Sequence, residues 1–576
     1  MPLTPGDLNA ALSRTLVDEW ARAGVETAAV SPGSRSTPLA LALAADERIA
    51  VDVFLDERSG SFFALGAAKA SGRPAIVLCT SGTAAAEFHP AVLEAFHARV
   101  PLIVCTADRP PELRDTGAGQ TVDQLKLYGD ALRWFAEVGA PSESEVTTPY
   151  WRSVGARSAA AACGPPAGPV HLNLAFREPL VPTGVDITLP PSRAGGAPWV
   201  TSTIRWPRPD PVDVDRLAHL IAAETRGVIV VGWGADVDPE VVERFAGVAR
   251  WPVFADPISG ARQGPNAIST YDALLRSPGV ATSLRPDVVV RLGAPLTGKV
   301  ATSWLDASVP QVLVDPDGAW LDPNRASAEH IVADPSALLD AVSLRGQARS
   351  QSFWLRAWQE AEGAARRSMD RLLDSWTEPF EGRIARDLVA GLGTGSTLVV
   401  GSSMPVRDVE TFAAPRTGVR FLSNRGVNGI DGFVSTVLGA ASQSTGPVVA
   451  LCGDLTFLHD SGGLLGAGRR GVEATFVVVD NGGGGIFNFL PQAGATADFE
   501  LLFGTPQGVD LSRLAAVHGI QSESVTTADA LVPAVHRAIA AGGVRLVVVR
   551  TDRVDNVARH RQVWEAVSVP GGSASG

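Results

Sequence analysis

The stretch "VVVDNGGGGIF", residues 477–487, places three valines of an expected buried strand directly before Asp480, Asn481 and four consecutive glycines. A run of glycines leaves the backbone bare, so a ligand can approach its carbonyl and N–H groups closely. Upstream, in "ALCGDLTFLHD" (450–460), another expected strand ends at Gly453 and Asp454, 27 residues before Asn481. This spacing holds one helix and one returning strand. We therefore expect both side chains at the same edge of a parallel sheet.

An Asp and an Asn side chain at one sheet edge suit a hard divalent cation. Magnesium usually takes few protein ligands and completes its coordination with phosphate oxygens. The pattern therefore predicts a metal-bound diphosphate beside the glycines. The alternative is a flexible glycine-rich turn between strand and helix, and the pairing of Asp454 with Asn481 favours the binding site.

Length and composition restrict the class of protein. The 576 residues predict two to four domains, and 45% hydrophobic and 19% charged residues are typical of a soluble globular protein. A net charge of −12 argues against a general nucleic-acid binder. We find no apolar run of membrane-spanning length and no signal peptide at the N-terminus. None of the four cysteines forms a C-x-x-C pair, and Cys79, Cys105 and Cys452 lie in apolar runs, which indicates buried thiols in a reducing cytoplasm.

Apolar strand patterns alternate with helical patterns along the whole chain. We expect strands at residues 25–30, 74–79, 101–107, 169–174, 226–234, 251–256, 286–293, 309–315, 396–403, 419–426, 447–454, 474–481 and 544–552. This order predicts parallel sheets covered by helices, an α/β class with three doubly wound domains. We expect domains at residues 1–190, 205–355 and 378–566, followed by a disordered tail at 567–576. The Pro- and Gly-rich residues 179–199 are interpreted as a linker, and 352–376 as a helical connector.

The Asp454–Asn481 pair resembles the thiamine diphosphate motif, Gly-Asp-Gly followed by Asn-Asn a little under thirty residues later. Leu455 replaces its second glycine, and Asp480 replaces its first asparagine. The first block, "FLDERSGSFFALGAAKASGRPAIVLCTSGT", resembles the pyrimidine-binding domain of thiamine enzymes. Glu57 matches the glutamate that hydrogen-bonds the aminopyrimidine in that family. The alternative for Glu57 alone is a surface residue that opens a helix.

An ordered set of motifs across all three blocks is more specific. It comprises "SPGSRSTPL", "TSGTA", "TADRPPEL", "GAGQT", "LTGK", "SSMPVRD", "SNRGVNGIDG" and "GDLTFLHD". The set resembles the 2-succinyl-5-enolpyruvyl-6-hydroxy-3-cyclohexene-1-carboxylate synthase family of menaquinone biosynthesis. The resemblance implies thiamine diphosphate-dependent decarboxylation of 2-oxoglutarate and Stetter-like 1,4-addition of the succinyl-semialdehyde carbanion to isochorismate. It also implies a homodimer or dimer of dimers. Each cofactor would then lie between the domain at 1–190 of one chain and the diphosphate-binding domain at 378–566 of another.

The resemblance assigns candidate roles residue by residue. The catalytic set is Glu57, Gln120, Arg407 and Arg425. The metal ligands, for Mg²⁺ or Mn²⁺, are Asp454, Asn481 and Gly483. The remaining cofactor contacts are Ser81, Gly82, Ser403, Met404, Leu455 and Ile486, in addition to Glu57. The substrate set is Ser34, Arg35, Arg109, Gln120, Lys299, Ser403, Arg407, Arg425, Phe487 and Leu490. Some family members carry a second cation after the position of Lys299, where this chain has Val300.

Arginines suit this chemistry independently, because both substrates are dicarboxylates and a guanidinium holds a carboxylate with two hydrogen bonds. Singly, each arginine is more often solvated or structural. Two rival functions stay open at this point. One is a different thiamine enzyme, such as a 2-oxoacid decarboxylase or an acetolactate-type synthase. The other is a degenerate fold that binds ligand and regulates without catalysis.

Overall fold

The computed structural model describes residues 3–185, 187–203, 205–346 and 352–568. The chain forms two compact units. One comprises Met1–Arg205, Asn424–Thr445 and Thr456–Glu473, and the other comprises Trp206–Ser423, Gly446–Leu455 and Ala474–Gly576. Two internal segments of the third expected domain thus pack with the first unit. The predicted boundaries at 1–190, 205–355 and 378–566 stay predictions.

The first unit is built on a six-stranded parallel sheet of order β2-β1-β3-β4-β6-β5. Its strands are β1 (Thr27–Val30), β2 (Ala50–Val53), β3 (Ala75–Cys79), β4 (Leu102–Asp108), β5 (Trp134–Glu137) and β6 (Pro169–Ala175). The helices of this unit are α1 (Pro5–Arg22), α2 (Thr37–Ala44), α3 (Glu57–Ser71), α4 (Thr83–Glu87), α5 (His89–His97), α6 (Tyr150–Cys163) and α16 (Phe433–Gln443).

The second unit contains two parallel sheets. The five-stranded sheet has the order β11-β10-β9-β7-β8, from β7 (Gly227–Val231), β8 (Val253–Ala255), β9 (Val288–Leu292), β10 (Gln311–Val314) and β11 (Ser327–Ile331). The six-stranded sheet has the order β13-β12-β14-β15-β17-β16. Its strands are β12 (Thr397–Val400), β13 (Arg420–Leu422), β14 (Val448–Gly453), β15 (Ala474–Asp480), β16 (Gln521–Val525) and β17 (Val544–Arg550).

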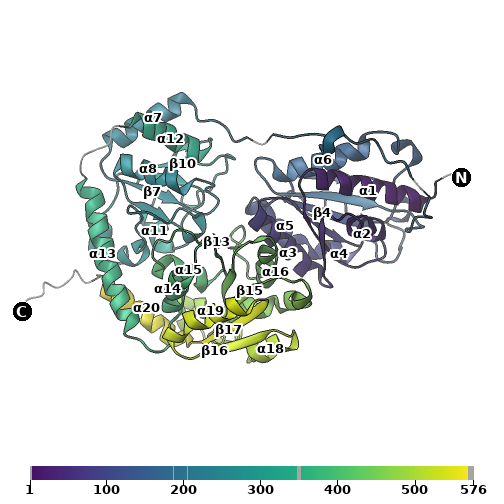
Figure 1. Cartoon of the computed structure of the whole chain (residues 1–576). Helices are drawn as coiled ribbons and strands as arrows, with labels where there is room; N and C mark the ends of the chain where they lie inside the picture. The colour runs from purple at the N-terminus through teal and green to yellow at the C-terminus, as the bar shows by residue number, and fades with distance from the viewer. Residues whose placement is uncertain (1–2, 186, 204, 347–351, 569–576) are drawn as a thin grey trace, which may run out of the picture. The chain divides into compact units, whose positions relative to one another are not determined.

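The helices of the second unit surround these sheets, and α13 packs beside the C-terminal helix α20 (Figure 1). The first group is α7 (Pro211–Ala223), α8 (Pro239–Ala249), α9 (Tyr271–Leu274), α10 (Pro278–Ser283), α11 (Lys299–Trp304), α12 (Pro335–Arg345) and α13 (Phe353–Asp374). The second group is α14 (Glu381–Gly391), α15 (Met404–Phe412), α18 (Leu511–Val517), α19 (Leu531–Ala541) and α20 (Arg553–Ser568), while α17 (Asp454–His459) follows β14.

The three sheets share one topology. Numbered within each sheet, both six-stranded sheets have the order 2-1-3-4-6-5, and the five-stranded sheet has 2-1-3-4-5. Every strand pair among the described residues is parallel. The predicted α/β class with three parallel sheets is confirmed. In such sheets, strand 2 lies on one side of strand 1 and strand 3 lies on the other, so the chain reverses its direction of travel across the sheet at strand 1. This reversal opens a crevice at the carboxyl ends of strands 1 and 3.

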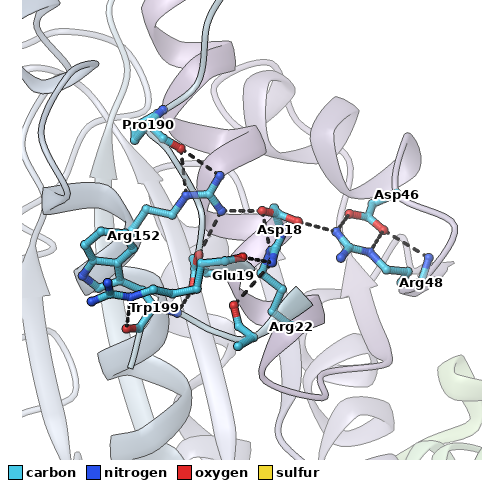
Figure 2. A network of polar contacts seen from close by, with 10 residues as sticks. Asp18, Glu19, Arg22, Asp46, Arg48, Arg152, Pro190 and Trp199 are labelled. Atoms are coloured by element: carbon cyan, nitrogen blue, oxygen red, sulfur yellow. Dashed lines mark hydrogen bonds and ion pairs between the residues drawn. The ribbon is translucent and has the colours of Figure 1, made fainter. Parts of the chain in front are cut away.

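The segment predicted as a linker is anchored rather than free. Arg152 on α6 donates two hydrogen bonds to the carbonyl of Pro190, at 3.1 and 3.0 Å, and one to Glu19 on α1 at 2.9 Å (Figure 2). The second oxygen of Glu19 accepts the backbone N–H of Trp199 at 2.7 Å. Asp18 joins the same network through Arg152 and Arg48. Residues 179–199 are therefore held against α1 and α6 at both Pro190 and Trp199.

Two further features bear on the expectations. Helix α20 runs through Ser568 with Val567 buried, so residues 567 and 568 are helical and not part of a disordered tail. The rest of the predicted tail, 569–576, lies outside the described residues. Cys79, Cys105 and Cys452 are free, buried thiols, as predicted. No helix within the described ranges combines the length and the apolar character needed to cross a membrane.

Candidate active site

The ends of β14 and β15 bring together the two side chains that the sequence pairs. Gly453, the last residue of β14, is in register with Val479 of β15, so Asp454 and Asn481 both follow the carboxyl edge of one sheet. The Asp454 side chain is 6% exposed, and burial raises the pKa of its carboxyl group to about 6. The backbone N–H of Leu455 donates to this carboxyl group at 2.8 Å, and this bond and the nearby backbone N–H of Gly483 oppose that rise. Asp454 and Asn481 thus follow neighbouring strands at the same sheet edge, with the glycine loop beside the carboxyl group.

Asn481 presents one end of its amide to the protein and keeps the other available. Its Nδ2 donates to Glu381 Oε1 at 2.8 Å. Its Oδ1 is buried and has no hydrogen-bond partner among the described residues. A buried amide oxygen without a donor is costly in a folded protein, and such an atom is often explained by a missing ion or water. The orphaned oxygen is thus the atom expected of a cation ligand.

The glycines after Asn481 shape a close backbone turn. Gly482 and Gly483 have φ values of 75° and 135°, which side-chain-bearing residues rarely adopt. A Cβ on Gly483 would lie 2.0 Å from the carbonyl oxygen of Gly504. Gly484 donates its N–H to the same carbonyl at 2.8 Å. The loop therefore needs glycine at Gly483 for both conformation and space.

A strained residue follows β12, next to β14 at the switch point of the same sheet. Ser403 has φ 74° although it is not glycine, and it precedes α15, which begins at Met404. Arg407, one turn into α15, donates a hydrogen bond to the Ser403 carbonyl. Strain of this kind persists where surrounding structure enforces it and is common at functional sites. Met404 is 7% exposed.

A cavity of about 310 Å³ joins several predicted residues of the second unit. Five predicted site residues line it: Lys299, Met404, Arg407, Ile486 and Leu490. Val300 lines it too. Ile486 belongs to the short 3-10 helix η7 (Gly485–Phe489), and Phe489 from the same helix lines the cavity. Phe487, which the sequence assigns to the apolar wall, packs against Phe503 with ring centroids 5.5 Å apart.

The acidic residues of the cavity are engaged with protein partners. Asp272 pairs with Arg276 at 3.0 Å, and Asp408 contacts His560 at 2.9 Å. Glu410 accepts from the Tyr271 hydroxyl at 2.6 Å, and burial raises its pKa to about 8. In contrast, neither Lys299 nor Arg561 has an ion-pair partner within the described residues. The cavity is therefore suited to an anionic ligand.

In the first unit, Glu57 opens α3 directly after Asp56, which caps that helix. The Glu57 side chain is half-buried, and burial raises the pKa of its carboxyl group. The neighbouring acidic residues Asp56 and Glu87 raise it further. A carboxyl group with increased proton affinity is what proton exchange with a ligand requires.

Four other predicted residues of this unit lie together beyond β3 and β4. Arg109 donates to the Ser81 hydroxyl and, at 3.0 Å, to the Gln120 carbonyl. A Cβ on Gly82 would lie 2.9 Å from the Gln120 side chain. The charge of Arg35 lowers the pKa of Arg109 further after burial has done so, which places the two cations within electrostatic range. Arg35 itself is tied to Glu178 at 2.9 Å, and Ser34 beside it is exposed.

Arg425 belongs to a loop that is fixed by a buried carboxylate. Glu94 accepts the backbone N–H groups of Gly426 at 3.0 Å and Val427 at 2.8 Å, and it pairs with Lys69 at 2.9 Å. The Arg425 side chain is 8% exposed. Glu94 and Lys69 hold the backbone on which Arg425 sits, and no sequence motif indicated them.

Sequence reasoning also missed residues of the second unit. Glu381 precedes β12 by a full helix. Arg276 lies in the turn between α9 and α10, and His560, Arg561 and Trp564 lie on α20, far from the predicted motifs. The only signal for Asp408 was its place in "SSMPVRD". Among the described residues, no group of three or more His, Cys, Asp or Glu side chains could hold a metal. The predicted ligand set, Asp454, Asn481 and Gly483, has only one side chain of these four types, so a search for such groups does not detect it.

Comparisons with known proteins agree with this architecture. Residues 10–127 match the N-terminal TPP binding domain of thiamine pyrophosphate enzymes, 196–395 the middle domain, and 407–549 the C-terminal TPP binding domain. A solved structure of a protein named as a thiamin diphosphate-dependent enzyme from Mycobacterium smegmatis superposes with a TM-score of 0.71. It is 20% identical and covers 96% of this chain and 100% of its own, which supports the fold.

Curated relatives are much closer in sequence. A protein of Thermobifida fusca is 46% identical, with 97% of this chain and 98% of the relative covered. One of Chloroflexus aurantiacus is 44% identical over 95% of this chain and 94% of the relative. Both are named 2-succinyl-5-enolpyruvyl-6-hydroxy-3-cyclohexene-1-carboxylate synthase. With matching motifs, fold and near-complete coverage, the chain belongs to the 2-succinyl-5-enolpyruvyl-6-hydroxy-3-cyclohexene-1-carboxylate synthase family of thiamine diphosphate-dependent transferases.

Proposed function

We propose that this enzyme decarboxylates 2-oxoglutarate and adds the remaining four-carbon unit to isochorismate, a step of menaquinone biosynthesis. The observation that carries the proposal is the site after β14 and β15. Asp454 offers a buried carboxylate, and Asn481 offers a buried oxygen without a hydrogen-bond partner among the described residues. The backbone carbonyl of Gly483, in the same loop, would add a third oxygen. This donor set fits Mg²⁺ or Mn²⁺ that is also bound to a diphosphate.

Thiamine diphosphate, when bound, supplies the electron sink that decarboxylation of a 2-oxoacid requires. The chain's own residues bind and orient the partners. Asp454, Asn481 and Gly483 would hold the cation, and Ser81, Gly82, Ser403, Met404, Leu455 and Ile486 would contact the cofactor. The raised pKa of Glu57 supports its role as the carboxyl group that exchanges a proton with the aminopyrimidine.

The substrate assignment rests on charge. Both substrates are dicarboxylates, and the cavity beside Met404 exposes Lys299 and Arg407 while its acidic residues are engaged elsewhere. Ser34, Arg35, Arg109, Gln120, Arg425, Phe487 and Leu490 complete the proposed substrate set. Val300 leaves the position after Lys299 without a second cation.

The decisive experiment is mass detection of the product from 2-oxoglutarate and isochorismate, with and without thiamine diphosphate and Mg²⁺. Product that requires both additions is expected. A 2-oxoacid decarboxylase or an acetolactate-type synthase would instead release carbon dioxide from pyruvate, so pyruvate is the matched alternative substrate. Release from pyruvate with none from 2-oxoglutarate would overturn the proposal.

We further propose a homodimer, alone or paired into a tetramer, whose sites combine Glu57 of one chain with Asp454 of another. Co-expression of a Glu57→Gln chain with an Asp454→Ala chain tests this arrangement. Mixed dimers would contain one site with neither substitution and would recover activity that each variant lacks alone. Failure of co-expressed chains to recover activity would contradict shared sites.

A further inference from the structure

An asparagine can ligate a cation only through its amide oxygen, yet its two amide ends have almost the same shape. Rotation by 180° exchanges Oδ1 and Nδ2 with little change in packing, so the hydrogen-bond surroundings must choose the orientation. At Asn481, the hydrogen bond of Nδ2 sets the orientation of the amide. The donor reaches Glu381 Oε1 at 2.8 Å, while Oδ1 is buried without a partner among the described residues.

Burial and a second hydrogen bond hold the Glu381 side chain in place, so it can fix the orientation of the Asn481 amide. It is the first residue of α14 and is 4% exposed. The same Oε1 accepts the hydroxyl of Thr551 at 3.2 Å, so two donors from separate strand ends converge on one oxygen. A Cβ on the next residue, Gly382, would lie 2.4 Å from the ring of Phe412, which shows how tightly this helix start is packed.

The chemistry of a carboxylate makes the selection one-sided. Glu381 Oε1 accepts from both Asn481 Nδ2 and the Thr551 hydroxyl, so this oxygen attracts the NH₂ end of the Asn481 amide and repels the oxygen end. The opposite rotamer would place two acceptors against each other in a buried site. Gly485 closes the other side, because a Cβ there would lie 2.7 Å from Nδ2.

We propose that Glu381 is a positioning residue that fixes the Asn481 amide with Oδ1 directed to the cation. This inference rests on the proposed function, because it assumes that Asn481 is a metal ligand. Glu381 itself would not touch the metal. It would hold the Asn481 amide in the binding orientation before the cation arrives, so that no free energy is spent on orienting it. Residues that hydrogen-bond metal ligands have this role in other metal sites.

The test must separate orientation from charge, since Glu381 also contributes a negative charge near the proposed cation. Glu381→Ala removes both the acceptor and the charge. Glu381→Gln removes the charge but keeps a carbonyl oxygen that can accept from Asn481 and Thr551. Glu378→Ala removes an exposed carboxylate three residues earlier, which pairs with Arg559 at 3.5 Å, and serves as the matched control.

The measurement is calorimetric titration of Mn²⁺ into the full chain at a fixed concentration of thiamine diphosphate. Glu381→Ala is expected to weaken Mn²⁺ binding about 10- to 100-fold. Glu381→Gln should lose less than about threefold, because its carbonyl still selects the amide orientation. Glu378→Ala should match the wild type. Wild-type affinity in Glu381→Ala, or a loss in Glu381→Gln as large as in Glu381→Ala, would overturn the inference.

Two further results, no Mn²⁺ binding by the wild type and failure of Glu381→Ala to fold, have separate consequences. Absence of Mn²⁺-dependent binding in the wild-type chain would reject the metal site and, with it, both proposals. If Glu381→Ala does not fold, Glu381→Met decides, because it fills a similar volume but offers no oxygen that can accept from Asn481. Glu381→Met should show the loss expected of Glu381→Ala, and wild-type Mn²⁺ affinity in this variant would overturn the positioning role.

Discussion

The backbone N–H of Gly483 lies close enough to the carboxyl group of Asp454 to lower the pKa of that group, which links the loops that follow β14 and β15. Adjacent parallel strands deliver the two residues to one edge of the sheet. The glycine loop therefore lies beside the buried acidic group. The Asp454 carboxylate also accepts the backbone N–H of Leu455 at 2.8 Å, so it has a structural partner as well as a proposed cation.

Replacement of Asp454 by Ala should remove the one charged side chain among the proposed ligands of the cation. We expect the Mg²⁺-dependent affinity for thiamine diphosphate to fall by at least about tenfold, as hydrogen bonds and contacts to charged groups contribute about 1.5–3 kcal/mol. Titration calorimetry with thiamine diphosphate at fixed Mg²⁺ measures the change. Unaltered affinity in this variant would place the metal elsewhere.

Replacement of Glu57 by Gln should separate binding from turnover. The amide keeps the shape of the side chain but cannot exchange a proton, so we expect cofactor affinity to persist while kcat falls by about 100-fold or more. Steady-state turnover and a cofactor titration on the same preparation provide the two readouts. Glu47→Gln, an exposed position, is the control. A kcat near that of the control would remove Glu57 from the reaction.

The fold was predictable where strands are buried on both faces. All the expected strands were found, because parallel central strands such as β3 and β15 are continuous apolar runs. The four strands that the sequence pattern did not indicate are β2, β5, β11 and β16, and each lies at the edge of its sheet. An edge strand such as β16 is largely exposed, so polar residues interrupt the apolar pattern.

The candidate site was predictable where a motif follows a strand, as at Asp454, Asn481 and Ser403. Residues that support these positions carry no such signal. Glu381 lies 100 positions before Asn481, and Glu94 lies 332 positions before Gly426. Each is a single acidic residue on a helix, the commonest setting for a solvated charge. Only the packing of helices onto the sheet reveals what each carboxylate holds.

Lys299 should contribute binding energy for an anionic substrate. A Cβ on Gly298, the residue before it, would lie 2.9 Å from Glu410 Oε2, so this glycine lets the start of α11 pack against Glu410, and Lys299 lines the cavity. We expect Lys299→Gln to lower kcat/KM by about 10- to 100-fold, the value of one hydrogen bond to a charged group. Lys299→Arg keeps the charge and should recover part of the loss. If the Gln and Arg variants have equal kcat/KM, charge at this position does not matter.

The ion network of α1 and α6 predicts how stability responds to acid. Burial would raise the pKa of Asp18, but hydrogen bonds from Arg48, Arg152 and Arg22 outweigh it and lower the pKa to about 2. An unfolded Asp titrates near pH 4. The ionised group therefore stabilises the fold above about pH 4, and this contribution is lost as the pH falls toward 2.

Asp18→Asn tests that dependence in the first unit. The variant should unfold at a lower temperature than the wild type near pH 7, and the difference should shrink as the pH is lowered below 4. Thermal unfolding followed by circular dichroism at several pH values measures it, with Glu47→Gln as the exposed control. A difference that stays constant down to pH 3 would show that the ionisation of Asp18 does not stabilise the network.

Two adjacent glycines allow strain to be separated from close contact in the loop after Asn481. A Cβ on Gly482 would meet nothing within 4 Å, whereas one on Gly483 would lie 2.0 Å from the Gly504 carbonyl oxygen. Both positions have positive φ, 75° at Gly482 and 135° at Gly483, so alanine at either costs about 1–3 kcal/mol in conformational strain. Only Gly483→Ala must also displace backbone, and with it the N–H that lies beside Asp454. We therefore expect Gly482→Ala to retain Mg²⁺-dependent binding of thiamine diphosphate and Gly483→Ala to lose it, although both chains fold. Equal binding by the two variants, measured by calorimetry, would mean that the loop does not need its close approach to Gly504.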